Sequence, residues 1–362
     1  MRSSRRAVLV GAGLAATGLL LPRRAAASKL TVGYVYVGPK DDLGYSQTHA
    51  VAAQRVAAMP GVELVEQEEV PESASVRAAL EAMIVERGAR LVYPTSYGYY
   101  DPYVLELAAR HPEVYFRHAG NRWQEGHPPN IGSYVAHMHE GQYLAGVMAA
   151  QAAPNGRLGF VASFRYPGII RSVNAFALGA QRANPEATLR VAFIGGWTNP
   201  AKEAEIVNLY ADQGLEAVGC SLDSSRTVVS TARARRVYAC GYYHPMKEFG
   251  GEYYLTSPLV DWAALNMRTV SQVLAGERPP NYFEGGLAES MVTLDYDSPH
   301  MDGAAAAAVE RARGELVVGG RSIWTGPIVD SEGIERIAPG EAVPRGDVRL
   351  KSMDWFVRGV QA

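Results

Sequence analysis

The chain has 362 residues, a length that corresponds to about two domains of roughly 150 residues each. Hydrophobic residues make up 48% of it and charged residues 20%, so it can bury a large core. A formal charge of −2 excludes a strongly basic nucleic-acid-binding protein. Two cysteines exclude a disulfide framework and a cysteine-rich metal site. Tyr (20) outnumbers Phe (8), which is typical of a chain whose aromatic rings meet water or a ligand.

Residues 1–27 predict an export signal. The start is basic (Arg2, Arg5 and Arg6), an apolar run from Ala7 to Leu21 follows, and Ala25-Ala26-Ala27 supplies a small-residue cleavage site. The apolar run is shorter than the roughly 20 residues that a membrane span needs. The paired arginines resemble those of a twin-arginine signal, and ordinary secretion is the alternative route.

Cleavage after Ala27 leaves Ser28 at the new N-terminus, so no N-terminal Cys is present to carry a lipid anchor. The mature chain keeps 30 basic residues against 37 acidic ones, a formal charge of about −7. We therefore expect an acidic, soluble protein in the periplasm or extracytoplasmic space.

The first part of the mature chain alternates strands and helices. Apolar, β-branched runs predict buried strands, and apolar residues spaced by four predict helices. An Asp-Pro pair at 101–102 marks the start of a helix. In chain order we expect strands at 31–37 and 63–65, a helix at 75–88, a strand at 90–95, a helix from 101, a strand at 114–118 and a helix at 143–153.

The pattern restarts after the turn at Asn155-Gly156. We expect a strand at 158–162, a helix at 169–182, a strand at 188–194, a helix at 199–212, strands at 217–220, 236–240 and 253–256, and a helix at 261–274. Regular alternation of strand and helix predicts parallel sheets with right-handed crossovers. Two such series predict an α/β fold of two doubly wound lobes that face one another.

Polar aromatic residues follow most of these strands. Ligands of such sheets bind at the carboxyl ends of the strands. The turns concerned are 38–46, 96–103, 164–167, 195–199, 221–224 and 241–244. Aromatic residues in the turns of both lobes favour a clamp for a flat ligand. Asp42, Asp101, Asn199 and Asp223 in these turns have a second interpretation as helix caps.

Motifs of catalysis are absent from the sequence. It contains no G-x-S-x-G, no P-loop and no H-E-x-x-H, so we expect no enzyme activity, no cofactor and no metal. His137, His139 and Glu140 form a close cluster, which we interpret as a surface stretch rather than a metal site. Cys220 and Cys240 end predicted strands and either bridge or stay free.

Five stretches in order resemble the basic-membrane-protein (Bmp, purine-nucleoside-receptor-like) family of ABC-transporter substrate-binding proteins. They lie at 33–39, 143–146, 170–176, 197–203 and 353–360. The resemblance implies a type I periplasmic-binding-protein fold with two lobes, three hinge crossings and a ligand in the cleft. It also implies docking on a membrane permease powered by an ATPase. We assign 28–154 and 254–290 to lobe 1, and 155–253 and 291–362 to lobe 2.

Relatives in this family sandwich a purine ring between two aromatic residues, one from each lobe. The matching positions here are Tyr45, in Asp42-Leu43-Gly44-Tyr45, and Trp197, just before Asn199-Pro200-Ala201-Lys202. Stacking on a base contributes about 1–3 kcal/mol. The polar candidates for contact with the ring edge are Asp42, Tyr99, Asp101, Arg171, Asn174, Asp223 and Tyr242.

Two departures from the family pattern bear on the ligand. Nucleoside-binding relatives carry a D-S-D stretch that suits a ribose diol, and here those positions are Tyr243-His244-Pro245. A Lys that is usual after Thr-Ser is here Val260. Because charged acceptors bind hydroxyls strongly, their loss favours a free nucleobase such as adenine over a nucleoside. The alternatives are a nucleoside or other heterocycle, a sensor subunit, and an exported hydrolase; we expect a monomer that binds no nucleic acid.

Overall fold

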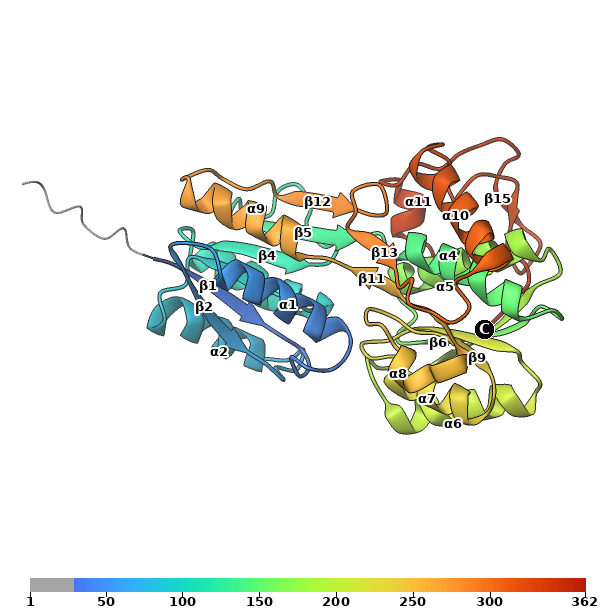
Figure 1. Ribbon diagram of the computed structural model, residues 1–362. Coiled ribbons are helices and arrows are strands. Elements are labelled where there is room, and N and C mark those ends of the chain that lie inside the picture. The colour runs from blue at the N-terminus through green and yellow to red at the C-terminus, as the bar shows by residue number, and fades with distance from the viewer. Residues whose placement is uncertain (1–28) are drawn as a thin grey trace, which may run out of the picture.

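The computed structural model describes residues 29–362, so the predicted export signal lies outside the described residues. The described chain forms two α/β lobes side by side (Figure 1). Each lobe is built on a six-stranded sheet, and every strand pair within these two sheets is parallel. Helices therefore cover both faces of each sheet, as parallel strands require.

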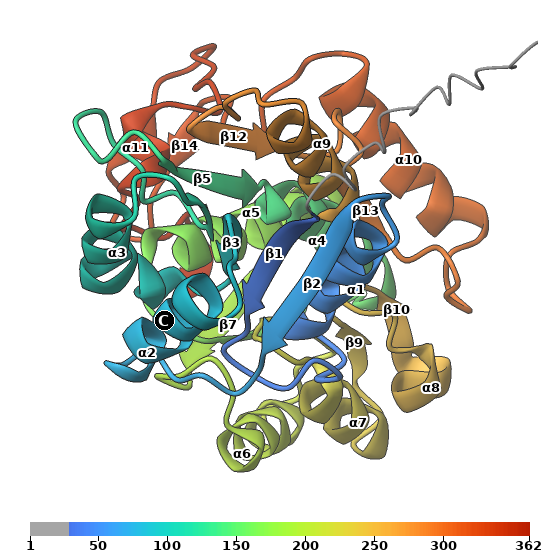
Figure 2. The same ribbon diagram turned by 90° about the vertical axis from the view of Figure 1, so that its left-hand side faces the viewer.

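Lobe 1 carries the sheet in the order β12-β5-β4-β3-β1-β2. β1 buries both of its faces, because Val32, Tyr34 and Val35 are fully inaccessible to solvent. Helices α1 and α9 pack on one face, and α2 and α3 on the other (Figure 2). The strands are β1 (Leu30–Val35), β2 (Val62–Gln67), β3 (Leu91–Pro94), β4 (Tyr115–Ala119), β5 (Ile131–Ala136) and β12 (Tyr282–Gly285). The helices are α1 (Tyr45–Ala57), α2 (Ser75–Glu81), α3 (Leu105–Arg110) and α9 (Ala263–Leu274).

Lobe 2 carries the sheet in the order β10-β9-β8-β6-β7-β16. Figure 1 shows α4 and α5 on one side of this sheet and α6 and α7 on the other. The strands are β6 (Arg157–Ala162), β7 (Thr188–Phe193), β8 (Ala217–Ser221), β9 (Tyr238–Cys240), β10 (Tyr254–Thr256) and β16 (Val360–Gln361). The helices are α4 (Met138–Ala152), α5 (Pro167–Ala183), α6 (Pro200–Asp212), α7 (Arg226–Ala234), α8 (Lys247–Gly250), α10 (Gly303–Val317) and α11 (Val348–Lys351).

Helix α4 lies in lobe 2, whereas the predicted boundary at residue 154 put it in lobe 1. Its apolar residues belong to the core of lobe 2. Two glycines explain the close approach of α4 and α5, because a Cβ on Gly146 would collide with the Phe176 carbonyl and a Cβ on Gly179 with the Tyr143 carbonyl. Strand β10 also pairs within lobe 2, so the chain returns to lobe 1 after residue 256, whereas the predicted boundary put the return after residue 253.

The chain crosses between the lobes three times. The crossings follow β5, β10 and β12, and β11 (Pro258–Val260) pairs antiparallel with β13 (Val292–Leu294) between the lobes. The expected two doubly wound lobes with three crossings are confirmed. Helix α1 and strand β5 were not expected from the sequence. Strand β5 contains Gly132 and Ser133, and it forms through its pairing with β4 and β12.

The C-terminal segment returns to lobe 2. β14 (Ile328–Val329) and β15 (Glu335–Ile337) form a small antiparallel pair, and β16 joins the second sheet beside β7. Cys220 and Cys240 are both buried and free, which decides between the two states left open by the sequence. Across residues 29–362, no helix has the length and apolar character that a membrane crossing requires.

Candidate functional site: a cleft between the lobes

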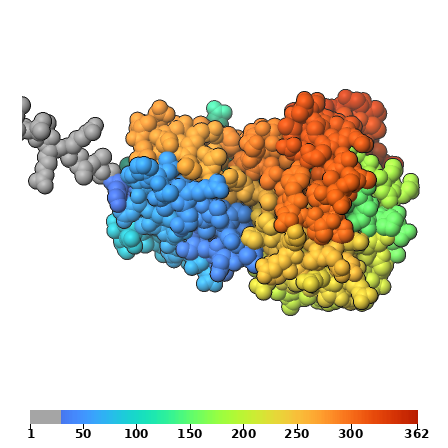
Figure 3. Space-filling model, viewed as in Figure 1, coloured from blue at the N-terminus to red at the C-terminus, as the bar shows by residue number. Residues whose placement is uncertain are grey.

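A cleft lies where the turns after the strands of the two lobes face each other. It encloses a cavity of about 200 Å³. Lobe 1 contributes the turns after β1, β3 and β4, and lobe 2 contributes the turns after β6, β7, β8 and β9. The space-filling view shows the two lobes in contact with each other (Figure 3). The cleft is at the edge that the strand-end rule predicts.

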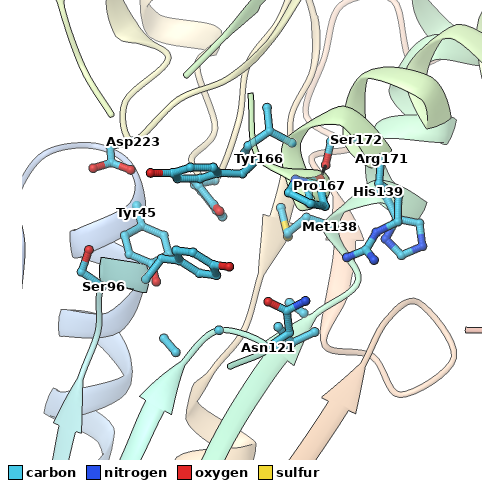
Figure 4. A pocket seen from close by; sticks show the side chains of 18 of the residues that line it. Tyr45, Ser96, Asn121, Met138, His139, Tyr166, Pro167, Arg171, Ser172 and Asp223 are labelled. Carbon is cyan, nitrogen blue, oxygen red and sulfur yellow. Dashed lines mark hydrogen bonds between the residues drawn. The ribbon is translucent and has the colours of Figure 1, made fainter. Parts of the chain in front are cut away.

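Five of the nine predicted site residues line this cleft. They are Tyr45 from lobe 1 and Arg171, Trp197, Asp223 and Tyr242 from lobe 2. Figure 4 shows Asp223 and Arg171 on opposite sides of the pocket, with Tyr45 on the side of Asp223. The structure therefore brings together residues that are up to about 200 positions apart in the sequence.

Asp42 and Tyr99 lie outside the cleft lining, because other groups engage their side chains. The Asp42 carboxylate accepts three backbone N–H groups of the turn that begins α1, at 2.8, 2.9 and 3.0 Å. Asp42 therefore acts as a cap at this site, as its alternative interpretation held. Tyr99 is fully buried and its hydroxyl donates to the Val70 carbonyl.

Asp101 and Asn174 are also absent from the cleft lining. Asp101 is exposed and its carboxylate lies 4.0 Å from the Arg122 guanidinium. Asn174 is fully buried: its amide nitrogen donates to the Trp355 carbonyl (2.9 Å) and its amide oxygen accepts from the Val357 N–H (3.0 Å). Asn174 thus holds the C-terminal segment against α5.

Most lining residues were not among the predicted set. Five of them that carry polar or charged groups are Tyr97, Asn121, His139, Tyr166 and Lys351. Tyr97 and Tyr166 follow β3 and β6 at the strand ends already singled out, so position alone was a usable signal. Lys351 gave no such signal, because only the return of the C-terminal segment brings it to the cleft.

Two pairs of tyrosines make ring contacts between the lobes. The ring centroids of Tyr45 and Tyr243 are 5.3 Å apart, and those of Tyr97 and Tyr166 are 5.5 Å apart. Trp197 packs edge-to-face on Tyr166, with centroids 6.1 Å apart. Aromatic faces from both lobes therefore surround the cavity, and six of the 20 tyrosines line it.

The lobes also touch through their backbones near Asp223. The Tyr45 N–H donates to the Asp223 carbonyl at 2.7 Å, and Gly44 forms a β-bridge with Ser224. A Cβ on Gly44 would collide with that same carbonyl, so glycine permits the contact. The Trp197 indole N–H donates to the Glu72 carboxylate at 3.3 Å. These contacts describe a closed arrangement of the lobes.

The two sides of the cleft differ in charge. We call the side formed by Tyr45, Trp197 and Asp223 the acidic end. Burial, and then the nearby carboxylates of Asp42 and Glu72, raise the pKa of the Asp223 carboxyl well above its usual value. We call the side formed by Arg171, Lys351 and His139 the basic end.

His137, His139 and Glu140 are buried, so their interpretation as a surface stretch was wrong. Each has at most 5% of its surface exposed, because the three residues begin α4 at a hinge crossing. Burial lowers the pKa of His137 to about 3 and that of His139 well below its usual value, which keeps both rings neutral. Within the described residues no three His, Cys, Asp or Glu side chains form a metal-binding group.

Comparisons with known proteins agree with this architecture. A family model described as "Bmp: ABC transporter substrate-binding protein PnrA-like" matches residues 29–312. A purine-binding protein of Brucella abortus is 30% identical over 338 residues, which cover 92% of this chain and 94% of the relative. A putative ABC transporter glucose-binding protein of Haloferax volcanii is 30% identical over 337 residues, covering 92% of this chain and 80% of the relative.

A solved structure of similar fold comes from Aeropyrum pernix. It is an ABC transporter solute-binding protein with a TM-score of 0.70 and 17% identity, covering 89% of this chain and 96% of that one. This likeness, together with the two parallel sheets and three crossings, confirms the expected type I periplasmic-binding-protein fold.

Proposed function

Because this chain belongs to the Bmp family of PnrA-like ABC transporter substrate-binding proteins, we propose that it captures a purine-like ligand outside the cytoplasm and delivers it to an ABC importer. The ligand we favour is a free nucleobase, held between aromatic residues of the two lobes. The observation that supports this most is the ring of aromatic side chains from both lobes around one cavity, with Tyr45 and Trp197 on opposite lobes.

The site chemistry suits a flat, uncharged or weakly charged ring. Stacking on aromatic faces contributes about 1–3 kcal/mol per base. The positions Tyr243-His244-Pro245 offer no carboxylate for a ribose diol, which favours a nucleobase over a nucleoside. The Brucella abortus relative, which is 30% identical to this chain, is described as purine-binding, and this supports the same ligand class.

Capture in this proposal is a shift between open and closed lobes. A ligand that touches both lobes only in the closed state stabilises that state by its differential affinity. The β-bridge between Gly44 and Ser224 is part of the closed state, so closing also forms contacts between the lobes themselves. The closed protein, as a monomer, then docks on the permease, and the ATPase supplies the energy; the chain carries out no reaction on the ligand.

Isothermal titration calorimetry on the purified mature chain tests the ligand class. We expect saturable 1:1 binding of at least one purine base, with nucleosides weaker. Glucose belongs in the same screen because a relative is described as a putative glucose-binding protein. Tight binding of glucose, or the absence of measurable binding to every purine tested, would overturn the proposal that the ligand is a purine.

Two substitutions test the aromatic clamp. Tyr45→Ala and Trp197→Ala should each weaken purine binding by roughly 10-fold or more, because each removes a stacking face. Tyr238→Ala is a matched control, since this tyrosine contacts Tyr253 and His300 and does not line the cleft. If both cleft variants bind as tightly as the parent, the clamp is wrong.

A further inference from the structure

The basic end of the cleft is assembled from two parts of lobe 2. Arg171 comes from α5, and Lys351 is the last residue of α11. Both line the cleft, and Figure 4 shows Arg171 beside His139, across the pocket from Asp223. Because burial keeps the His139 ring neutral, Arg171 and Lys351 are the charged groups at this end. Both are hydrogen-bond donors only.

The Arg171 guanidinium has an unused donor. Its Nη1 donates to the Leu350 carbonyl at 3.1 Å, which fixes its position against α11. Its Nε is buried and has no hydrogen-bond partner within the described residues. Burial lowers the pKa of Arg171, yet a guanidinium stays charged under ordinary conditions. Because Arg171 lines the cleft, a ligand bound there can supply the acceptor that this buried donor lacks.

The acids near this end have partners of their own. Glu140 accepts from the Leu287 N–H at 2.8 Å and pairs with Arg345 at 2.8 Å. Glu289 pairs with the same Arg345 at 2.9 Å. The Glu284 carboxylate accepts a hydrogen bond from the Tyr282 hydroxyl at 2.9 Å. None of these three acids lines the cleft, so its basic end presents its positive groups to the ligand.

We infer that the basic end is a subsite for carbonyl oxygen or negative charge, so that the captured purine is an oxopurine of the xanthine or urate type. This inference rests on the proposed function, since it names the purine class within it. Charge-assisted hydrogen bonds from Arg171 and Lys351 favour an oxygen acceptor. An exocyclic amine, as in adenine, would face like donors and leave them unpaired, which selects against it.

The C-terminal segment contributes directly to this subsite. Lys351 and Leu350 both follow residue 312, where the match to the family model ends. Asn174 holds the same segment through Trp355 and Val357. The part of the chain beyond the matched region therefore positions the groups that select among purines.

Calorimetry with urate, xanthine and adenine tests the inference on the mature chain. We expect urate and xanthine to bind at least about 10-fold more tightly than adenine, as one charged hydrogen bond warrants. Adenine binding as tightly as the oxopurines, or more tightly, would overturn the subsite and leave purine capture intact. If neither these three ligands nor any other purine shows measurable binding, the proposed function is overturned, and the subsite with it.

Variants identify the groups responsible. Lys351→Met should weaken urate binding by about 10-fold and change adenine binding by less than about threefold. Lys247→Met makes the same charge change outside the cleft, and should alter neither affinity. Arg171→Lys keeps the charge but loses the planar donor set, so it should weaken both oxopurines and melt close to the parent temperature. Equal losses of urate and adenine affinity in Lys351→Met would contradict the subsite.

Discussion

The acidic and basic ends of the cleft are built in different ways. At the acidic end the two lobes touch through their backbones, where the Tyr45 N–H meets the Asp223 carbonyl. At the basic end the key groups belong to one lobe, where Arg171 is fixed by Leu350 of the C-terminal segment. The difference teaches that contacts between the lobes form at the first end, whereas the groups of the second are fixed by contacts within one lobe.

Detaching the C-terminal segment should break the basic end. Asn174→Ala removes the amide that holds Trp355 and Val357, and leaves a buried carbonyl and N–H without partners. We expect the free energy of unfolding to fall by about 2–4 kcal/mol. Urea unfolding measures it, and Gln181→Ala is the control, because its amide holds Arg358 at an exposed position. A loss as small as that of the control would contradict the role of Asn174.

A methyl group on Gly44 should break the acidic end. Gly44→Ala places a Cβ against the Asp223 carbonyl, so the lobes cannot meet there without moving. We expect ligand affinity to fall by about 10–100-fold, which is about 1.4–2.7 kcal/mol, and small-angle scattering to show a larger radius of gyration with ligand present. Gly314→Ala is the matched control, since no atom lies within 4 Å of its Cβ position. Unchanged affinity in Gly44→Ala would show that closure does not need this contact.

A buried histidine behind Tyr45 makes the acidic end sensitive to pH. Burial lowers the pKa of His49 to about 3, against 6.5 in an exposed chain, and its ring stacks on Trp262 at 4.8 Å. Between these two values the unfolded chain binds a proton that the folded chain does not, so stability is lost as pH falls from 6.5 towards 3.

The variant His49→Gln removes this titration. We expect the stability of the parent relative to the variant to decline by about 1.4 kcal/mol per pH unit between about pH 5.5 and 4. Chemical unfolding at a series of pH values measures the slope, and His244→Gln, on a half-buried ring, is the control. Parallel stability curves for parent and His49→Gln would refute the neutral buried ring.

The smallest expected effect sharpens the role of Trp197. Trp197→Phe keeps an aromatic face but removes the indole N–H that donates to Glu72 across the lobes. Because the bond is exposed, we expect affinity for the purine to fall by only about 3–10-fold, equivalent to one modest hydrogen bond. Calorimetry measures it. A loss as large as that of Trp197→Ala would assign the effect to the indole ring rather than to this hydrogen bond.

Much of the fold was predictable because its signals are local. Apolar runs such as 31–37 and 158–162 predicted the central strands, and Asn199 before Pro200 predicted the start of α6, where its side chain accepts from the Lys202 N–H at 3.1 Å. Strand β5 gave a weak signal, because its pairing with β4 and β12 outweighs the low strand preference of Gly132 and Ser133.

The candidate site was predictable in part. Tyr45 and Trp197 follow strands and match family positions, so their place at the cleft was expected. Asn174 and Tyr99 are polar residues of the same kind, but their hydrogen bonds inside the lobes remove them from the cleft. A sequence cannot distinguish a polar side chain that faces a ligand from one that satisfies a buried backbone group.

The sequence by itself determined the strand–helix alternation, the two lobes, the family and the gathering of tyrosines at strand ends. Only the tertiary structure decided that α4 packs in lobe 2, that Cys220 and Cys240 stay free, and that Lys351 reaches the cleft. The physical reason is separation along the chain. Local patterns set strands, helices and caps, whereas the charge of the cleft depends on contacts between Arg171 and a segment about 180 residues away.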